Sequence, residues 1–306
     1  MTKKRRPPRK MNRDGALVFF GILIILAFIT VQWFTIQFNR DRAQAATKNQ
    51  IVVQETIQNT VCDQPVLCHK YVAPQAEEAQ TIVPVLMYHH IRNAQPYYTA
   101  RERLYSVNPA TLEAQMQQLK EAGYTPISLE VFWKSLKRGP STLPDRPVLL
   151  TFDDGYKNHF KEAYPVLKKF NFPAIFFVYT DAIGLGGYMS KEMLSELASD
   201  PHMMIEAHSV THGALTSMSE AQRMQEMEDS KSILEAIIQK PVTAFSYPYG
   251  AFSSVMEDEV KRAGYDMAFR IGPSSRQGYD SRFRIQRIQV LSWDDPVNLI
   301  EKFAGR

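Results

Sequence analysis

Short apolar runs alternate with amphipathic segments along the chain from Val83 onward. Apolar runs of four to eight residues are typical of buried strands, and apolar residues that recur every three or four positions are typical of helices. The predicted strands are VPVLMYH (83–89), TPIS (125–128), PVLLTFDD (147–154), PAIFFVYT (173–180), MMIEAHS (203–209), TAFSYPYG (243–250), YDMAFRI (265–271) and RIQRIQV (284–290).

The predicted helices carry end signals of their own. Asn108 is suited to the N-cap of a helix, with Pro109 at its first position and Gly123 after its last turn, and Ser219 is suited to the N-cap of a longer one. Because about seven strands alternate with helices, the fold class is α/β with parallel strands. We expect an incomplete (β/α) barrel whose chemistry lies at the carboxyl ends of its strands. The predicted helices are residues 108–124, 158–171, 191–199, 219–238, 253–264 and 296–305.

An uncharged apolar stretch, residues 15–38, precedes this domain and is long enough to cross a bilayer as a helix. Trp33 near its far end is typical of a membrane interface, and the Lys and Arg residues before it favour a cytoplasmic N-terminus. We therefore predict a single-pass membrane anchor with the rest of the chain outside the cell. A signal peptide cleaved after AQA (43–45) is the alternative, but that sequence lies well beyond the apolar core.

The formal net charge of +4 comes from the amino terminus. Residues 1–14 carry seven Lys or Arg and one Asp, whereas the remainder has 29 basic and 31 acidic residues. Outside the tail the chain therefore has no excess of positive charge that would bind nucleic acid, and we expect no nucleic-acid partner. Residues 1–14 are predicted to be a cytoplasmic tail.

Residues 39–82 are rich in Gln, Ala and Thr, and we interpret them as an extracellular stalk that carries a single domain, residues 83–306. Cys62 and Cys68 are the only cysteines of the chain. A small disulfide loop suits an extracellular location, and two free thiols are the alternative.

Two adjacent carboxylates, Asp153 and Asp154, follow a predicted buried strand and precede Gly155. A strand end with an Asp-Gly turn explains this pattern as well as a chemical site does. His208 and His212, four residues apart, also come at a predicted strand end. Two histidines and an aspartate form a site for a divalent cation that leaves coordination positions open for water and substrate. A cation would also relieve the repulsion between the paired carboxylates.

The motifs TFDDGY (151–156), HSVTH (208–212) and FSYPYG (245–250) occur in the order found in the polysaccharide deacetylase family, which this sequence resembles. PVLMYHHI (84–91) is similar to the branch that includes bacterial poly-N-acetylglucosamine deacetylases. The resemblance runs from Val83 to about Val290. It implies an incomplete (β/α) barrel and a metal-dependent hydrolase that removes N-acetyl groups from a polysaccharide.

Carried over by motif position, the resemblance makes Asp153 the general base and Asp154 a metal ligand beside His208 and His212. One divalent ion is implied, with Zn²⁺ as the default and other first-row metals as alternatives. The backbone N–H at Tyr249 is implied to stabilise the tetrahedral oxyanion.

The sequence departs from the commoner family pattern at two places. Ser246 occupies the position of an arginine that orients the base, and the resemblance to the poly-N-acetylglucosamine deacetylase branch suggests that Arg287 supplies this charge from another strand. The commoner pattern also has a C-terminal histidine as the general acid, but no histidine follows His212 in this sequence. The resemblance selects His89, and alternation along the strand predicts that its neighbour His90 points to the opposite side.

Other groups have simpler interpretations. Asp295 before Pro296 is predicted to cap a helix, His69, His159 and His202 are predicted to be solvated or locally hydrogen-bonded, and Trp293 is assigned to core packing in preference to sugar stacking. The functional alternatives are a metallo-amidase or peptidase acting on wall peptides and a catalytically silent glycan-binding scaffold. The sequence leaves the polymer, the metal and the oligomeric state open.

Overall fold

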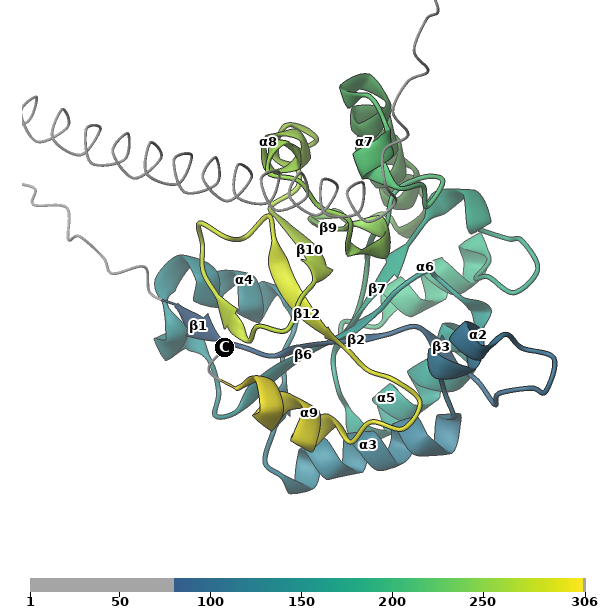
Figure 1. Cartoon of the computed structure of the whole chain (residues 1–306), viewed down its shortest axis with the longest axis vertical. Helices are drawn as coiled ribbons and strands as arrows, with labels where there is room; N and C mark the ends of the chain where they lie inside the picture. The colour runs from purple at the N-terminus through teal and green to yellow at the C-terminus, as the bar shows by residue number, and fades with distance from the viewer. Residues whose placement is uncertain (1–79, 305–306) are drawn as a thin grey trace, which may run out of the picture. The chain divides into compact units, whose positions relative to one another are not determined.

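A closed ring of seven parallel strands forms the centre of the structure, a computed structural model that describes residues 80–304 (Figure 1). Pairing between β2 and β6 completes the ring. The predicted α/β barrel of about seven strands is therefore confirmed, and it is incomplete only in holding seven strands instead of eight. In order around the ring, the strands are β2 (Val85–Tyr88), β12 (Ile285–Gln289), β10 (Met267–Ile271), β9 (Ala244–Ser246), β8 (Met203–Ala207), β7 (Ala174–Val178) and β6 (Pro147–Phe152).

Within residues 80–304, five short strands lie outside this ring. β5 (Thr125–Pro126) pairs in parallel with the amino-terminal end of β6, and β1 (Thr81–Ile82) pairs antiparallel with β11 (Arg276–Gln277). β3 (His90–Ile91) pairs with β4 (Ser106–Val107) just beyond the end of β2. The described fold therefore includes Thr81 and Ile82, two residues before the predicted start of the domain.

Alternate residues of each ring strand point to opposite sides, as strand geometry requires. In β6, Leu149 belongs to the cluster inside the barrel, whereas Leu150 packs outward against the helices. The apolar interior residues lie near the amino ends of the strands and leave the carboxyl ends to polar side chains. The ring strands contribute Val85, Leu149, Ile175, Phe177, Ala244, Met267, Phe269 and Ile285 to the inner cluster.

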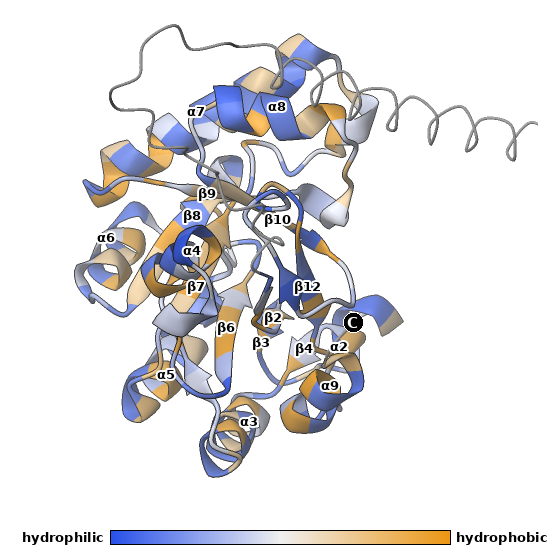
Figure 2. Ribbon diagram, turned by 90° about the vertical axis from the view of Figure 1, so that its left-hand side faces the viewer, coloured by the Kyte–Doolittle hydropathy of each residue, from blue (hydrophilic) through white to orange (hydrophobic). Residues whose placement is uncertain are grey.

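The helices surround the ring and bury their apolar sides against it (Figure 1). Along α7, α8 and α9 hydrophobic and hydrophilic positions are interspersed, whereas β12 is largely hydrophilic (Figure 2). The side chain of Asn108 caps α3 and that of Ser219 caps α7, as predicted. The larger helices are α3 (Pro109–Glu121), α4 (Leu129–Arg138), α5 (Tyr164–Phe170), α6 (Lys191–Ser199), α7 (Glu220–Ile238), α8 (Val255–Arg262) and α9 (Pro296–Phe303).

Among the larger helices, two segments differ from the prediction. The predicted helix 158–171 begins as a π-helical turn, His159–Ala163, and continues as α5. Pro165 lacks the N–H that a regular α-helical turn would use here, so the backbone widens before α5. The helix α4 was not predicted at all. Its Leu129, Phe132 and Leu136 join the inner cluster at the amino-terminal end of the barrel, and their helical spacing was the signal in the sequence.

No helix within residues 80–304 is long and apolar enough to span a membrane. The predicted tail, anchor and most of the stalk, together with Cys62 and Cys68, lie outside the described residues. These assignments stay predictions.

Candidate active site

The carboxyl end of β6 brings Asp153 and Asp154 to the mouth of the barrel. Thr151 and Asp153 continue the inward positions of this strand, and the Asp153 N–H donates to the Tyr88 carbonyl at 2.9 Å. At Asp154 the backbone turns into the left-handed region, with φ of 80°, and Gly155 follows with φ of 71°. Such conformations are costly for residues with a side chain and gather at functional sites. The turn lets two successive carboxylates face the same cavity.

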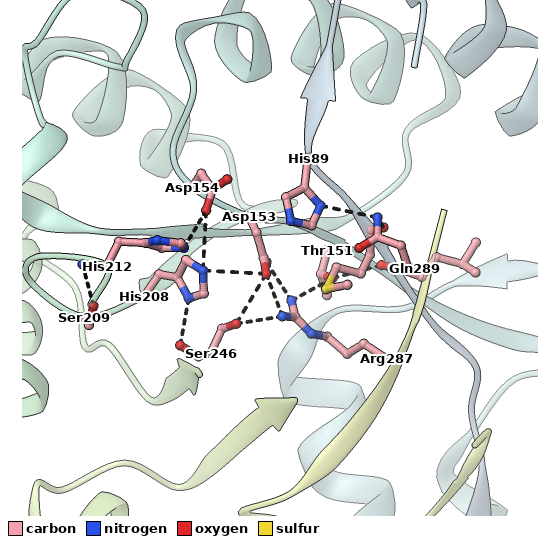
Figure 3. Close-up of polar contacts among 12 residues, drawn as sticks. His89, Thr151, Asp153, Asp154, His208, Ser209, His212, Ser246, Arg287 and Gln289 are labelled. Atoms are coloured by element: carbon pink, nitrogen blue, oxygen red, sulfur yellow. Dashed lines mark hydrogen bonds and ion pairs between the residues drawn. The ribbon is translucent and has the colours of Figure 1, made fainter. Parts of the chain in front are cut away.

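A second strand end supplies the two histidines. His208 follows β8 directly, and its Nε2 lies 3.5 Å from Asp154 Oδ1. His212 reaches the same oxygen, at 3.2 Å, from a turn in which Ser209 and His212 both have positive φ. The Ser209 hydroxyl accepts the His212 backbone N–H at 3.0 Å and holds this turn. Figure 3 shows the three side chains converging.

These three residues fit a divalent cation. Their nearest ligand atoms all lie within 4.8 Å of one another. Asp154 Oδ1 is buried and makes no hydrogen bond of normal geometry with residues 80–304, although the two imidazole nitrogens face it. His208 Nδ1 lies 2.7 Å from the Ser246 carbonyl, so this nitrogen carries the proton and Nε2 presents a lone pair. Two imidazoles and a carboxylate, with a cavity on one side, match a catalytic metal site.

Arg287 approaches Asp153 from β12, which is separated from β6 in the ring by β2 alone. Its two terminal nitrogens each donate to one Asp153 oxygen at 2.6 Å, and one of them also donates to the Ser246 hydroxyl at 2.7 Å (Figure 3). Burial opposes ionisation of Asp153, but the charge and hydrogen bonds of Arg287 outweigh it and hold the pKa below its ordinary value. β12 thus delivers to this carboxylate the positive charge that position 246 lacks.

His89 borders the same cavity and, in the view of Figure 3, lies on the side of Asp153 away from His212. Burial lowers the pKa of His89, an effect that the Asp154 and Asp153 carboxylates oppose. Gln289 Nε2 lies 3.3 Å from His89 Nδ1 and also donates to the Met87 carbonyl at 3.2 Å. The same nitrogen donates to the Val290 carbonyl at 3.0 Å. Gln289 thus contacts the Nδ1 side of the His89 ring, which leaves Nε2 as the nitrogen available for proton donation.

His90 does not point away from the site, contrary to the alternation prediction. Both His89 and His90 line the cavity. The reason is that β2 ends at Tyr88, so the period of two does not continue through this pair. The His90 ring stacks on Tyr156 at 3.7 Å between centroids, and burial lowers its pKa to about 3.

Tyr249 lies in the turn after β9, with φ of 60°. Its ring meets His212 edge-on at 4.6 Å, and the residue borders the cavity. A Cβ at the next residue, Gly250, would lie 2.6 Å from the Ile271 side chain, so only glycine fits there. The structure therefore brings all seven predicted site residues to one cavity of about 280 Å³.

Gln289 is the main residue of the cavity that the sequence analysis missed. Arg287 and Gln289, two positions apart in β12, were the available signal, because inward polar residues of a barrel strand lie two positions apart.

The prediction that Trp293 packs in the core is wrong, since its side chain is 70% exposed. Asp295 does cap α9, accepting from the Asn298 N–H at 3.0 Å.

Known proteins resemble the chain in both sequence and fold. A family model described as polysaccharide deacetylase matches residues 141–268. A putative polysaccharide deacetylase of Bacillus subtilis, YxkH, is 29% identical over 211 residues, which cover 68% of this chain and 71% of the relative. A poly-beta-1,6-N-acetyl-D-glucosamine N-deacetylase of Staphylococcus aureus is 25% identical over 241 residues, which cover 72% of this chain and 82% of the relative.

Solved structures agree with the sequence matches. The Streptococcus pyogenes deacetylase PplD, solved in complex with acetate, superposes with a TM-score of 0.66 at 28% identity, covering 72% of this chain and 97% of that one. IcaB from Ammonifex degensii, at 21% identity and a TM-score of 0.63, shares the fold. Sequence and fold comparisons thus both point to polysaccharide deacetylases, which are hydrolases, over the same domain.

Proposed function

We propose that this enzyme is a metal-dependent N-deacetylase of an extracellular N-acetylhexosamine polysaccharide, poly-N-acetylglucosamine or a cell-wall glycan, from which it releases acetate. One observation carries the proposal: Arg287 keeps a buried Asp153 ionised beside the Asp154, His208 and His212 group. The name of the Staphylococcus aureus relative supports the choice of polymer. A membrane-anchored, extracellular location is part of the proposal and rests on the pattern of residues 15–38.

Asp154, His208 and His212 would hold the divalent ion, which supplies Lewis acidity toward the acetamide carbonyl and lowers the pKa of water. Asp153 is the general base, because its carboxylate is ionised and held in one orientation. Each of its oxygens receives an Arg287 N–H, and Oδ2 also accepts from the Ser246 hydroxyl at 3.4 Å, so Oδ1 keeps a lone pair for the proton of the attacking water. The backbone N–H of Tyr249 is proposed to stabilise the oxyanion.

His89 is proposed as the general acid. Amide hydrolysis joins the water oxygen to the carbonyl carbon and breaks the carbon–nitrogen bond, and an amine leaves readily only when its nitrogen gains a proton. His89 borders the cavity away from His212, and in its imidazolium form Nε2 can give a proton to the leaving nitrogen while Gln289 contacts the Nδ1 side. His208 and His212 are committed to the ion and cannot take this role.

Released acetate tests the proposal directly. The full-length protein, purified in detergent and loaded with Zn²⁺, is offered peptide-free β-1,6-linked and β-1,4-linked N-acetylglucosamine oligomers and intact peptidoglycan. We expect acetate from at least one peptide-free glycan and none from an Asp153→Asn control. Release of new peptide amines without acetate would instead indicate an amidase of wall peptides. Glycan binding without acetate at saturating metal would indicate a silent scaffold.

A further inference from the structure

Regular strand structure is interrupted at His89. β2 ends at Tyr88 and β3 begins at His90, so His89 belongs to neither strand. Its carbonyl oxygen lies 2.6 Å from Nε2 of His159, seventy residues later in the sequence. A side chain thus replaces the strand partner that this carbonyl would have in a regular ladder.

His159 is buried among aromatic rings. It is 0% exposed, and its ring centroid lies 5.6 Å from that of Phe152 and 5.8 Å from that of Phe176. Burial lowers the pKa of His159 to about 4, so the imidazole is neutral, and the bond to a carbonyl puts its one proton on Nε2. Its Nδ1 makes no hydrogen bond with residues 80–304. Burying this unpaired nitrogen costs free energy that a phenylalanine ring would not incur. The hydrogen bond from Nε2 to the His89 carbonyl is therefore the one interaction here that histidine makes and phenylalanine cannot.

Asn158, the residue before His159, contacts the same short segment, residues 89–91. Asn158 Oδ1 accepts the Ile91 N–H at 3.0 Å, and Asn158 Nδ2 lies 3.5 Å from His90 Nδ1. Asn158 and His159 therefore hold the carbonyl before His90 and the amide after it. We call this pair the 158–159 clamp. It begins four residues after Asp154, at the start of the π-helical turn, and π-helical turns occur frequently at functional sites.

We propose that His159 is a positioning residue for proton donation, because its hydrogen bond to the His89 carbonyl sets where the His89 ring stands in the cavity. The inference rests on the proposed role of His89 as general acid. A proton donor must come within about 2.6–3.2 Å of the leaving nitrogen, and a displacement of about 1 Å can cost about 100-fold in rate. The clamp thereby ties the general acid to the loop that carries the base and a metal ligand.

The test compares two substrates that differ in their need for an acid. An N-acetylglucosamine oligomer expels an amine and requires a proton, whereas 4-nitrophenyl acetate expels a phenolate that leaves without one. His159→Phe keeps the ring volume and removes the N–H donor. We expect it to lower kcat for the amide by about 10- to 100-fold, with KM and zinc content unchanged, and to leave ester hydrolysis within about threefold of wild type. His159→Gln, which restores a donor, should recover part of the loss.

Matched controls separate this effect from a structural one. His202→Phe makes the same exchange at a half-exposed histidine whose imidazole faces Asp200, and its amide-to-ester ratio should equal that of wild type. Equal losses on both substrates in His159→Phe, or no loss on either, would overturn the proposal. If His159→Phe does not fold, Asn158→Ala decides in the same way. A selective loss on the amide supports the clamp, and a proportional loss overturns it.

The same assay with His89→Ala distinguishes failure of the inference from failure of the proposed function. A selective amide loss in His89→Ala but not in His159→Phe would leave the general acid in place and refute the clamp. Without a selective loss in His89→Ala, the general-acid assignment itself falls, and the clamp with it.

Discussion

Arg287 and Asp153, which lie 134 residues apart in the sequence, form a buried two-point ion pair with both N–O distances at 2.6 Å. The guanidinium also lies 5.1 Å from the centroid of the Phe177 ring and donates to the Thr151 hydroxyl at 3.3 Å. A buried carboxylate without this partner would lose much of its ionisation. The pair therefore keeps the proposed base charged although it is buried at the mouth of the barrel.

Removing Arg287 alone should destabilise the fold more than removing both partners. Arg287→Leu leaves an unpaired buried carboxylate, and breaking a buried pair in this way costs about 3–5 kcal/mol. Asp153→Leu combined with Arg287→Leu should recover part of that loss. Urea unfolding of the metal-free variants measures the coupling, and strictly additive effects would contradict it.

The stability loss in Arg287→Leu should depend on pH. In the wild type the folded-state pKa of Asp153 lies below its ordinary value of 3.8, so the pair contributes stability above that pH and loses it as the pH falls. Without Arg287, burial raises the pKa of Asp153. As the pH falls, Asp153 becomes protonated and the variant regains part of its lost stability. The difference in melting temperature between variant and wild type should therefore be largest near neutral pH and shrink toward acid. A constant difference would argue against ionised Asp153.

Asp154→Ala, His208→Ala and His212→Ala should each lose bound metal and activity together, because each removes one of the three ligands. Elemental analysis of the purified proteins provides the measurement, with about one ion per chain expected in the wild type. Asp153→Asn is the control, expected to keep its metal while losing activity. Unchanged metal content in all three ligand variants would exclude this set.

His89→Ala should lose about two to four orders of magnitude in deacetylation rate, the range typical of general acid catalysis, while keeping its metal. His90→Ala should be mild, even though both residues line the cavity. The reason is that the His90 pKa of about 3 makes it a poor proton donor at neutral pH. A larger loss in His90→Ala than in His89→Ala would reverse the assignment.

Gln289→Glu should move the basic limb of the pH profile to higher pH. A carboxylate 3.3 Å from His89 Nδ1 would favour the imidazolium and raise the pKa of His89, so the acid would stay protonated at higher pH. Gln289→Leu provides the comparison, because it removes the amide without adding charge. The measurement is kcat/KM against pH at saturating metal, and an unmoved basic limb in Gln289→Glu would show that His89 does not set it.

Protease added to protoplasts should remove the domain from the cell surface. The apolar span of residues 15–38, with its basic flank, predicts that the N-terminus is cytoplasmic and the domain external. An antibody to the domain follows the digestion, and a cytoplasmic marker shows that the membrane is sealed. Complete protection of the domain under these conditions would reverse the predicted topology.

Local chemistry explains why much of the fold could be predicted from the sequence alone. Asn108 and Ser219 cap helices through their own nearby backbone, and the period of two in β6 places Asp153 on the inner side whatever lies opposite. The motifs around Asp154, His208 and His212 identify the family because each is a contiguous run. These features depend on neighbours a few residues away, and a sequence displays such neighbours directly.

Only the tertiary structure decided which distant groups meet. Strand pairing between β2 and β6 closes the ring, the register of β12 places Arg287 against Asp153, and the π-helical turn brings His159 to the His89 carbonyl. Alternation failed at His90 because β2 ends one residue before His89, and the exposure of Trp293 depends on the path of the loop after β12. Contacts of this kind follow from ring closure and strand register. Many residues determine these jointly, so no local sequence pattern predicts them.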